Sequence, residues 1–206
     1  MFIISLFSAI IMCRWKWVNY PNKIGKTYKK NISYANRGMD LENLINDTNN
    51  YLLTNDIAVI YKKPTPIGVV KVEYVGNKQV ITKAYYSSPS TLDYNGIYKG
   101  RYIEFDAKET KNKTSFPLSN VHEHQIKHIE RIIVHGGIAF LIISMNENYY
   151  LLPGDKLISF IKGETRKSIP YEYIKNNGYL LEYNYSKGLN YIKYIDIIGG
   201  IYEENK

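Results

Sequence analysis

The sequence predicts one α/β domain, a mixed β-sheet flanked by helices, with a long β-hairpin projecting as a stalk. Three observations predict this class. Apolar residues recur at helical spacing in an early segment, and in several later segments they alternate at strand spacing. One run, 138–143, is apolar throughout, as expected of a central strand covered on both faces. The 206 residues are enough for one domain with a substantial core, which we expect over 34–202 after an arm over 1–33.

The first helix is expected over 39–51, because the apolar residues there repeat every three to four positions. This stripe consists of Leu41, Leu44, Ile45 and Leu52. A first strand is expected over 57–61. The segment 62–83 then predicts the stalk, because 69–75 alternates, Gly76 and Asn77 mark a turn, and a second strand returns over 79–85. An ordinary hairpin packed on the core would give the same pattern.

The remaining elements follow in order. A strand is expected over 102–107, and a helix begins near Ser119 or Asn120 as its N-cap residue. The apolar stripe of that helix consists of Val121, Ile126, Ile129, Ile132 and Ile133. Two further strands are expected over 138–144 and 149–152, and a helix over 155–162. The segment 179–198 is too rich in Tyr, Asn and Gly to assign.

An acid and a lysine lie two residues apart at the end of the strand expected over 102–107. They are Asp106, within the strand, and Lys108, just after it. Residues i and i+2 point to the same face of a strand, so the two side chains would stand roughly 6.5 to 7 Å apart along the backbone. Asp93 lies earlier, across a turn marked by Asn95-Gly96 and Lys99-Gly100. A hairpin would bring this second carboxylate beside the first.

Two carboxylates and one lysine suit metal-assisted hydrolysis of a phosphodiester. Carboxylates are hard oxygen ligands for Mg²⁺, which keeps several waters and also binds substrate phosphate. The lysine can orient the attacking water or stabilise developing charge. The alternative is a solvated strand face, because any amphipathic strand can carry an acid and a lysine.

Two neutral side chains extend the candidate site. Gln125 falls inside the apolar stripe of the expected helix, so its amide should face the sheet, and its carbonyl oxygen could face a metal or its water. A core glutamine satisfied by backbone groups is equally compatible with this pattern. Thr91 lies two residues before Asp93 and should share its strand face.

Three segments together resemble the RecU family of Holliday junction resolvases. They read YANRGMDLE over 34–42, YLLTNDIAVIYKKPTP over 51–66, and TLDYNGIYKGRYIEFDAKETKNKTSFPL over 91–118. The resemblance is collinear from about residue 20 to 198. It implies a restriction-endonuclease-like fold of the PD-(D/E)xK superfamily and a homodimer that cuts four-way junctions symmetrically. It also implies dependence on Mg²⁺, for which Mn²⁺ could substitute.

By motif, the resemblance assigns Thr91, Asp93, Asp106 and Gln125 to metal binding and Lys108 to the transition state. Family members carry Asp-Phe-Glu before Ala-Lys, where this chain has Glu104-Phe105-Asp106. Because Glu104 lies on the same strand face, it is a possible additional acid. The resemblance also implies that the stalk fits the central opening of a junction. The strand-exchange recombinase and a branch-migration helicase are further candidate partners.

The net charge of +8 predicts a polyanionic partner, here junction DNA. The segment 14–37 holds seven basic residues and no acid, and aromatic residues interleave with them. A solvated tail is the alternative for this arm. The candidate DNA contacts are Arg37, Lys62, Lys63, Lys71, Lys78, Lys83, Arg101, Lys111 and Lys113.

A single cysteine, Cys13, fits a reducing cytoplasm. The apolar residues 1–12 lack the charged start of a signal peptide and are too short for a membrane span, so we expect translation to start at Met12. His122, His124 and His128 lack the H-E-x-x-H pattern of a zinc site. The sequence thus predicts a structure-selective endonuclease of recombination and repair. The alternatives are a less selective nuclease of the same fold and a junction-binding modulator of the recombinase that does not cut.

Overall fold

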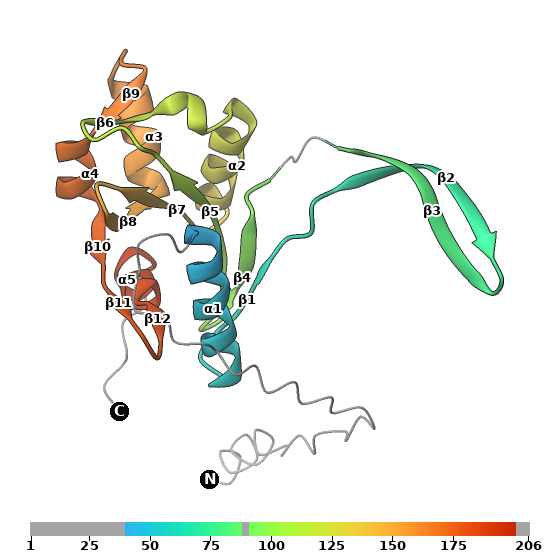
Figure 1. Ribbon diagram of the computed structural model, residues 1–206. Coiled ribbons are helices and arrows are strands. Elements are labelled where there is room, and N and C mark those ends of the chain that lie inside the picture. Colours follow the sequence, from blue (N-terminus) through green and yellow to red (C-terminus); the bar gives the residue numbers. More distant parts are fainter. Residues whose placement is uncertain (1–39, 88–90, 201–206) are drawn as a thin grey trace, which may run out of the picture. The chain divides into compact units, whose positions relative to one another are not determined.

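The computed structural model describes residues 40–87 and 91–200 (Figure 1). The chain divides between residues 36 and 37, and every described residue belongs to the second unit. The expected arm over 1–33, with its apolar start, lies outside the described residues, and so does Arg37. Within 40–87 and 91–200, no helix is both long and apolar enough to cross a membrane.

A six-stranded sheet forms the centre of the fold, in the order β1-β4-β5-β7-β8-β10. Neighbours in this sheet are antiparallel except for β5 and β7, which run parallel, so the sheet is mixed as predicted. The strands are β1 (Val59–Lys62), β4 (Tyr94–Tyr98), β5 (Arg101–Glu109), β7 (Ile138–Met145), β8 (Asn148–Pro153) and β10 (Tyr179–Leu181).

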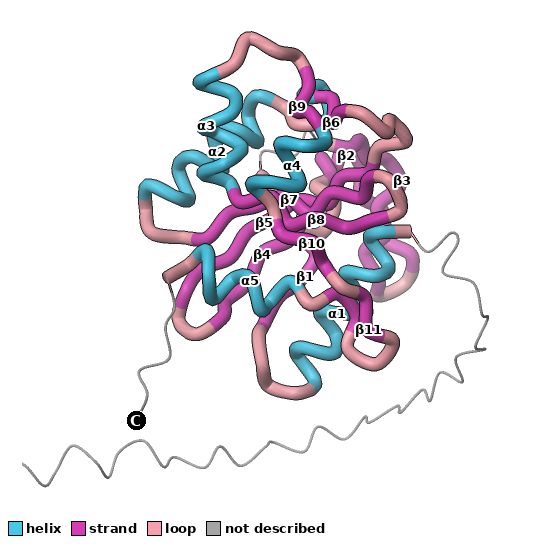
Figure 2. Tube along the Cα trace, turned by 90° about the vertical axis from the view of Figure 1, so that its left-hand side faces the viewer, coloured by secondary structure: helices cyan, strands magenta, loops and turns pink. Residues whose placement is uncertain are grey.

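Helices cover both faces of this sheet, which confirms the predicted α/β class (Figure 2). One face packs against α1 (Leu41–Thr54) and α5 (Tyr191–Ile198), with Phe105 and Phe140 between them. The other face packs against α2 (Glu123–Val134), α3 (Gly154–Gly163) and α4 (Tyr171–Asn177). The strand β7 contributes side chains to both cores, which explains its uninterrupted apolar run.

The hairpin formed by β2 (Ile67–Val75) and β3 (Lys78–Tyr86) is a two-stranded sheet of its own (Figure 1). All but one of its strand residues are exposed, so it projects from the domain instead of packing on the core. Gly76 at its tip has φ +61°, a value that favours glycine. Two register shifts interrupt the pairing between Val69 and Val72. The predicted projecting stalk is confirmed, a few residues later along the chain than expected.

Several short elements complete the fold. The strands β6 (Ser115–Pro117) and β9 (Ser168–Pro170) pair with each other, as do β11 (Tyr183–Asn184) and β12 (Gly188–Leu189).

The prediction for the start of the second helix was wrong. Residues 118–120 form a 3₁₀ turn, η1, and α2 begins only at Glu123 with His122 as its N-cap. Val121, which ends this turn, has an extended backbone at φ −117° and ψ 112°, so the turn does not continue into α2.

Candidate active site

The strand β5 places three charged side chains on one face of the sheet. Asp106 is fully buried and Lys108 is 18% exposed, and Lys108 Nζ lies 2.9 Å from Asp106 Oδ2. Glu104 lies two residues before Asp106 and is also buried. The intervening Phe105 packs into the opposite core beside α1. The alternation expected for this strand therefore holds, and the acid and the lysine form an ion pair.

Asp93 reaches Asp106 through the antiparallel pairing of β4 with β5. Tyr94 pairs with Phe105, so Asp93, which precedes Tyr94, lies beside Asp106, which follows Phe105. The Asp93 carboxyl is close enough to the Asp106 carboxyl to raise its pKa. Thr91 and Asp93 were expected on a strand, and this was wrong, because β4 begins only at Tyr94. Both residues lie in the irregular segment that leads into β4.

Of the two turn signals between Asp93 and Asp106, only one marks a turn. Lys99 and Gly100 have φ +46° and +74°, and they join Tyr98 to its partner Arg101 in a two-residue hairpin turn. Asn95-Gly96 was expected as a turn but lies within β4. A Cβ on Gly96 would lie 2.0 Å from the Val59 carbonyl oxygen in the neighbouring strand β1. Glycine at this position therefore allows the two strands to lie close together.

The surroundings of Asp106 oppose its ionisation. Burial, and then the neighbouring Asp93 carboxyl, raise the pKa of Asp106 from 3.8 to about 7, while Lys108 acts in the opposite direction. Asp106 also accepts hydrogen bonds from the Ala107 backbone N–H at 3.0 Å and from Gln125 Nε2 at 2.7 Å. The Lys108 ammonium favours the ionised carboxylate but does not outweigh burial and the neighbouring Asp93 carboxyl.

Gln125 lies in the third position of α2 and faces the sheet as expected, with 4% of its surface exposed. Its Nε2 binds Asp106, and its Oε1 accepts a hydrogen bond from the His122 backbone N–H at 3.0 Å. This second contact is part of the capping box that begins the helix. The amide oxygen therefore caps the helix in this structure, and its expected role toward a metal stays a prediction.

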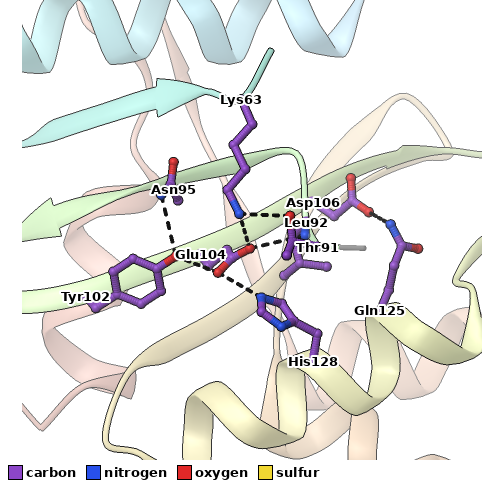
Figure 3. Close-up of polar contacts among 9 residues, drawn as sticks. All are labelled: Lys63, Thr91, Leu92, Asn95, Tyr102, Glu104, Asp106, Gln125 and His128. Carbon is purple, nitrogen blue, oxygen red and sulfur yellow. Dashed lines mark hydrogen bonds and ion pairs between the residues drawn. The ribbon is translucent and has the colours of Figure 1, made fainter. Parts of the chain in front are cut away.

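Glu104 is the centre of a second polar cluster beside Asp106 (Figure 3). Lys63 Nζ and the Leu92 backbone N–H donate to its Oε1, the latter over 3.2 Å. Tyr102 Oη donates to its Oε2 over 2.6 Å, and His128 Nε2 lies 3.0 Å from the same oxygen. Burial by itself would raise the pKa of Glu104, but the hydrogen bonds from Lys63 and Tyr102 and the contact with His128 outweigh it and lower that pKa.

The sequence reasoning missed this second cluster. His128 follows Gln125 by three residues and so shares its helix face, and Tyr102 precedes Glu104 by two and shares its strand face. Those spacings could have placed both near Glu104. Lys63, 41 residues away in sequence, gave no local signal. It also donates a hydrogen bond to Thr91 Oγ1 over 3.1 Å.

The donor set fits Mg²⁺. Two adjacent carboxylates, Asp93 and Asp106, supply hard oxygen ligands of the kind that this ion takes in small number together with water, and the Thr91 hydroxyl lies on the segment that carries Asp93. Burial and then the Asp93 carboxyl keep the pKa of Asp106 high, and a bound dication would favour its ionised form. Among the described residues, no three His, Cys, Asp or Glu side chains are grouped as a metal site.

The remaining predicted DNA contacts lie mostly on exposed surface. Lys62 pairs with Glu42 on α1, Lys71 with Glu73 at 2.6 Å, and Arg101 Nη2 donates to the Gly199 carbonyl at 2.8 Å. Lys63 is the exception, because it is only 25% exposed and binds Glu104. The other predicted contacts, Lys78, Lys83, Lys111 and Lys113, are exposed as well. Contact of these residues with DNA stays a prediction.

The chain is similar to several known proteins. The family model of RecU, Recombination protein U, matches residues 36–197. The Holliday junction resolvase RecU of Bacillus cereus (strain B4264) is 46% identical over 197 residues, covering 88% of this chain and 98% of the relative. The same figures hold for Holliday junction resolvase RecU of Bacillus mycoides (strain KBAB4). A solved structure of Hjc, a Holliday junction resolvase of Archaeoglobus fulgidus, aligns with a TM-score of 0.40 and 10% identity over 68% of this chain and 94% of that one.

Proposed function

Because the chain belongs to the RecU family, we propose that it resolves Holliday junctions as a structure-selective endonuclease of recombination and repair. The observation that carries the proposal is the buried Asp106, which meets Asp93, Lys108 and Gln125 at one point of the sheet. This combination of two acids and a lysine is suited to phosphodiester hydrolysis.

Asp93 and Asp106 would hold Mg²⁺, with Thr91 and Gln125 as further oxygen donors. The ion supplies a Lewis acid that lowers the pKa of a bound water and neutralises charge on the phosphate. Lys108, already 2.9 Å from Asp106, would orient the attacking water or stabilise the charge that develops on the phosphate. Burial of Asp106 keeps competing water away from its carboxylate.

The acid on β5 is shorter here than in the family pattern to which the chain is similar. Asp106 stands where that pattern has Glu, so its carboxylate is one methylene closer to the strand. The Asp93 carboxyl already contacts it in this position, and Gln125 reaches it from α2. An Asp at this position is therefore compatible with the same donor set.

Junction selectivity is assigned to the hairpin β2–β3. Its strands are exposed on the projecting part of the domain, and Lys71, Lys78 and Lys83 lie on it. Linear duplex has no central opening for such a stalk to enter, so the stalk would add affinity only for a four-way junction. Symmetric resolution requires two cuts in opposed strands, which a homodimer with two related sites provides. We place this activity in the cytoplasm, with the strand-exchange recombinase and the branch-migration helicase as candidate partners.

The test is incubation of the purified protein with a labelled four-way junction and a matched linear duplex, with Mg²⁺, with Mn²⁺ and with EDTA. We expect paired cuts in the junction with either metal, no cuts in EDTA, and little cutting of the duplex. Equal cutting of both substrates would indicate a less selective nuclease. Tight junction binding without cutting under every condition would indicate a modulator of the recombinase.

A further inference from the structure

Glu104 is a buried acid that the proposed reaction does not use. Only 1% of its surface is exposed, and it lies two residues from Asp106 on the same face of β5. An ionised carboxylate has about four lone-pair sites for hydrogen bonds. Four groups surround it, two at each oxygen: Lys63 and the Leu92 backbone at one, Tyr102 and His128 at the other. A metal ion could bind Glu104 only by displacing them.

The contacts of Glu104 with Lys63 and with the Leu92 backbone fix the irregular segment 91–93. This segment carries two candidate metal ligands, Thr91 and Asp93. The Leu92 backbone N–H, which binds Glu104, lies between Thr91 and Asp93. Lys63 reinforces the same segment at both ends, because its Nζ donates to Thr91 Oγ1 and its backbone N–H donates to the Asp93 carbonyl over 2.7 Å. Residues 91–93 lie outside β4, so these contacts act together with the neighbouring pairing of Tyr94 with Phe105 to set where the Asp93 carboxyl lies.

The contact with His128 fixes the helix that carries a third candidate ligand. His128 lies one helical turn after Gln125 on the same face of α2. Its Nε2 lies 3.0 Å from Glu104 Oε2, while Gln125 contacts Asp106. The helix is thus held to β5 at two neighbouring points, one through each acid (Figure 3).

We propose that Glu104 is a positioning residue for metal binding, which holds Asp93 and Gln125 in place relative to Asp106 without itself binding the metal. This inference rests on the proposed function. Groups that orient ligands in this way affect metal affinity strongly, and their loss typically costs about 10- to 100-fold in affinity or activity. Glu104 therefore completes the site through other residues, although it touches neither metal nor substrate.

The test measures Mn²⁺ binding directly, by electron paramagnetic resonance of the free ion, together with junction cleavage. Wild type, Glu104→Gln, Glu104→Asp and Asp106→Asn are compared. We expect Glu104→Gln to bind the same number of ions per chain as wild type, about 10-fold or more weakly. Glu104→Asp keeps the charge and should recover part of that affinity. Asp106→Asn, which loses a ligand, should bind most weakly of all.

Failure of the proposed function and failure of the positioning role would give different results. Failure of the wild type to bind Mn²⁺ or to cut the junction would refute the proposed function itself. Loss of binding in Glu104→Gln as complete as in Asp106→Asn would make Glu104 a ligand and overturn the positioning role. Wild-type affinity in Glu104→Gln, or the same affinity in Glu104→Asp as in Glu104→Gln, would also overturn it.

A second variant keeps the inference testable if Glu104→Gln does not fold. His128→Asn removes one contact with Glu104 and leaves the carboxylate in place. The matched control is His124→Asn, on an exposed position of the same helix. We expect Mn²⁺ affinity to fall several-fold in His128→Asn and to stay at the wild-type value in His124→Asn, with both variants folded in EDTA by circular dichroism. Equal Mn²⁺ affinity in the two variants would contradict the positioning role.

Discussion

Gln125 joins the start of α2 to Asp106, donating a hydrogen bond over 2.7 Å from Nε2 to Oδ2 of the acid. Its Oε1 accepts a hydrogen bond from the His122 backbone N–H, so both ends of the amide have partners. The place where the helix begins is therefore coupled to the place where the buried carboxyl lies. A change in either position would disturb the other, because one rigid amide spans the two.

Cleavage should depend on three side chains that contribute little to DNA affinity. We expect Asp93→Asn, Asp106→Asn and Lys108→Ala each to abolish junction cleavage, because these groups serve the metal and the transition state. Junction binding in gel-shift assays should stay within a few-fold of wild type, since lysines and arginines elsewhere supply the affinity. The matched control is Asp56→Asn, an exposed acid after α1 whose positive φ asparagine also tolerates. A folded variant that loses binding as severely as cleavage would contradict the assignment.

Stability of the metal-free protein should fall as the pH rises from about 4 to about 7. Burial and Asp93 raise the pKa of Asp106 to about 7, so the folded state keeps a proton that the unfolded state releases in this range. Each pH unit in the window then costs up to about 1.4 kcal/mol from this group. Asp106→Asn removes the titration. In EDTA at pH 8 it should melt at a higher temperature than wild type, and the difference should shrink at pH 5. A lower melting temperature for the variant at pH 8 would refute the predicted direction of this pH dependence.

Removal of the hairpin should abolish junction preference and spare the domain. The Ser87 backbone N–H donates to the Pro66 carbonyl over 2.9 Å, so the two ends of the hairpin are adjacent and a short Gly-Ser linker can replace Ile67–Tyr86. We expect a folded protein with unchanged Mn²⁺ binding and equal affinity for junction and duplex in competition gel shifts. Lys78→Gln with Lys83→Gln, which keeps the hairpin but removes two of its charges, should lower the junction preference only in part and flatten the salt dependence of junction binding. Undiminished preference without the hairpin would place selectivity elsewhere, first in the basic arm.

The protein should be a homodimer in solution. Two cuts in opposed strands require two active sites related by a two-fold axis. Light scattering at micromolar concentration should therefore give about twice the chain mass, with and without Mg²⁺. A monomer that still made paired nicks would exclude this arrangement.

Local sequence patterns predicted the main elements because each carries its own periodicity. The helix α1 and the strands β5, β7 and β8 lie within a few residues of their expected positions. The short strands β6, β9, β11 and β12 were missed, since two or three residues cannot show alternation. The segment 179–198, left unassigned, ends in α5, whose Tyr191 and Ile195 pack against the core beside α1.

Within the candidate site, the sequence predicted the acids and the lysine but not what surrounds them. Asp106 and Lys108 share a strand face by simple alternation, and a hairpin turn brings Asp93 to them. The partners of Glu104 could not be predicted in this way. Lys63 meets it only because β1 forms the edge of the sheet beside β4, a pairing that depends on tertiary structure.

The register shifts in the hairpin have a consequence for the solubility of the protein. The strands β2 and β3 expose many β-branched and aromatic side chains, including Val70, Tyr74 and Tyr86, at 56%, 73% and 81%. A long, flat strand of this composition would be a template for open-ended pairing with other chains. Irregular pairing between Val69 and Val72 twists and bends the strands, so their outer edges cannot present an even row of donors and acceptors. The same irregularity that interrupts the ladder thus guards an apolar stalk against aggregation while no DNA covers it.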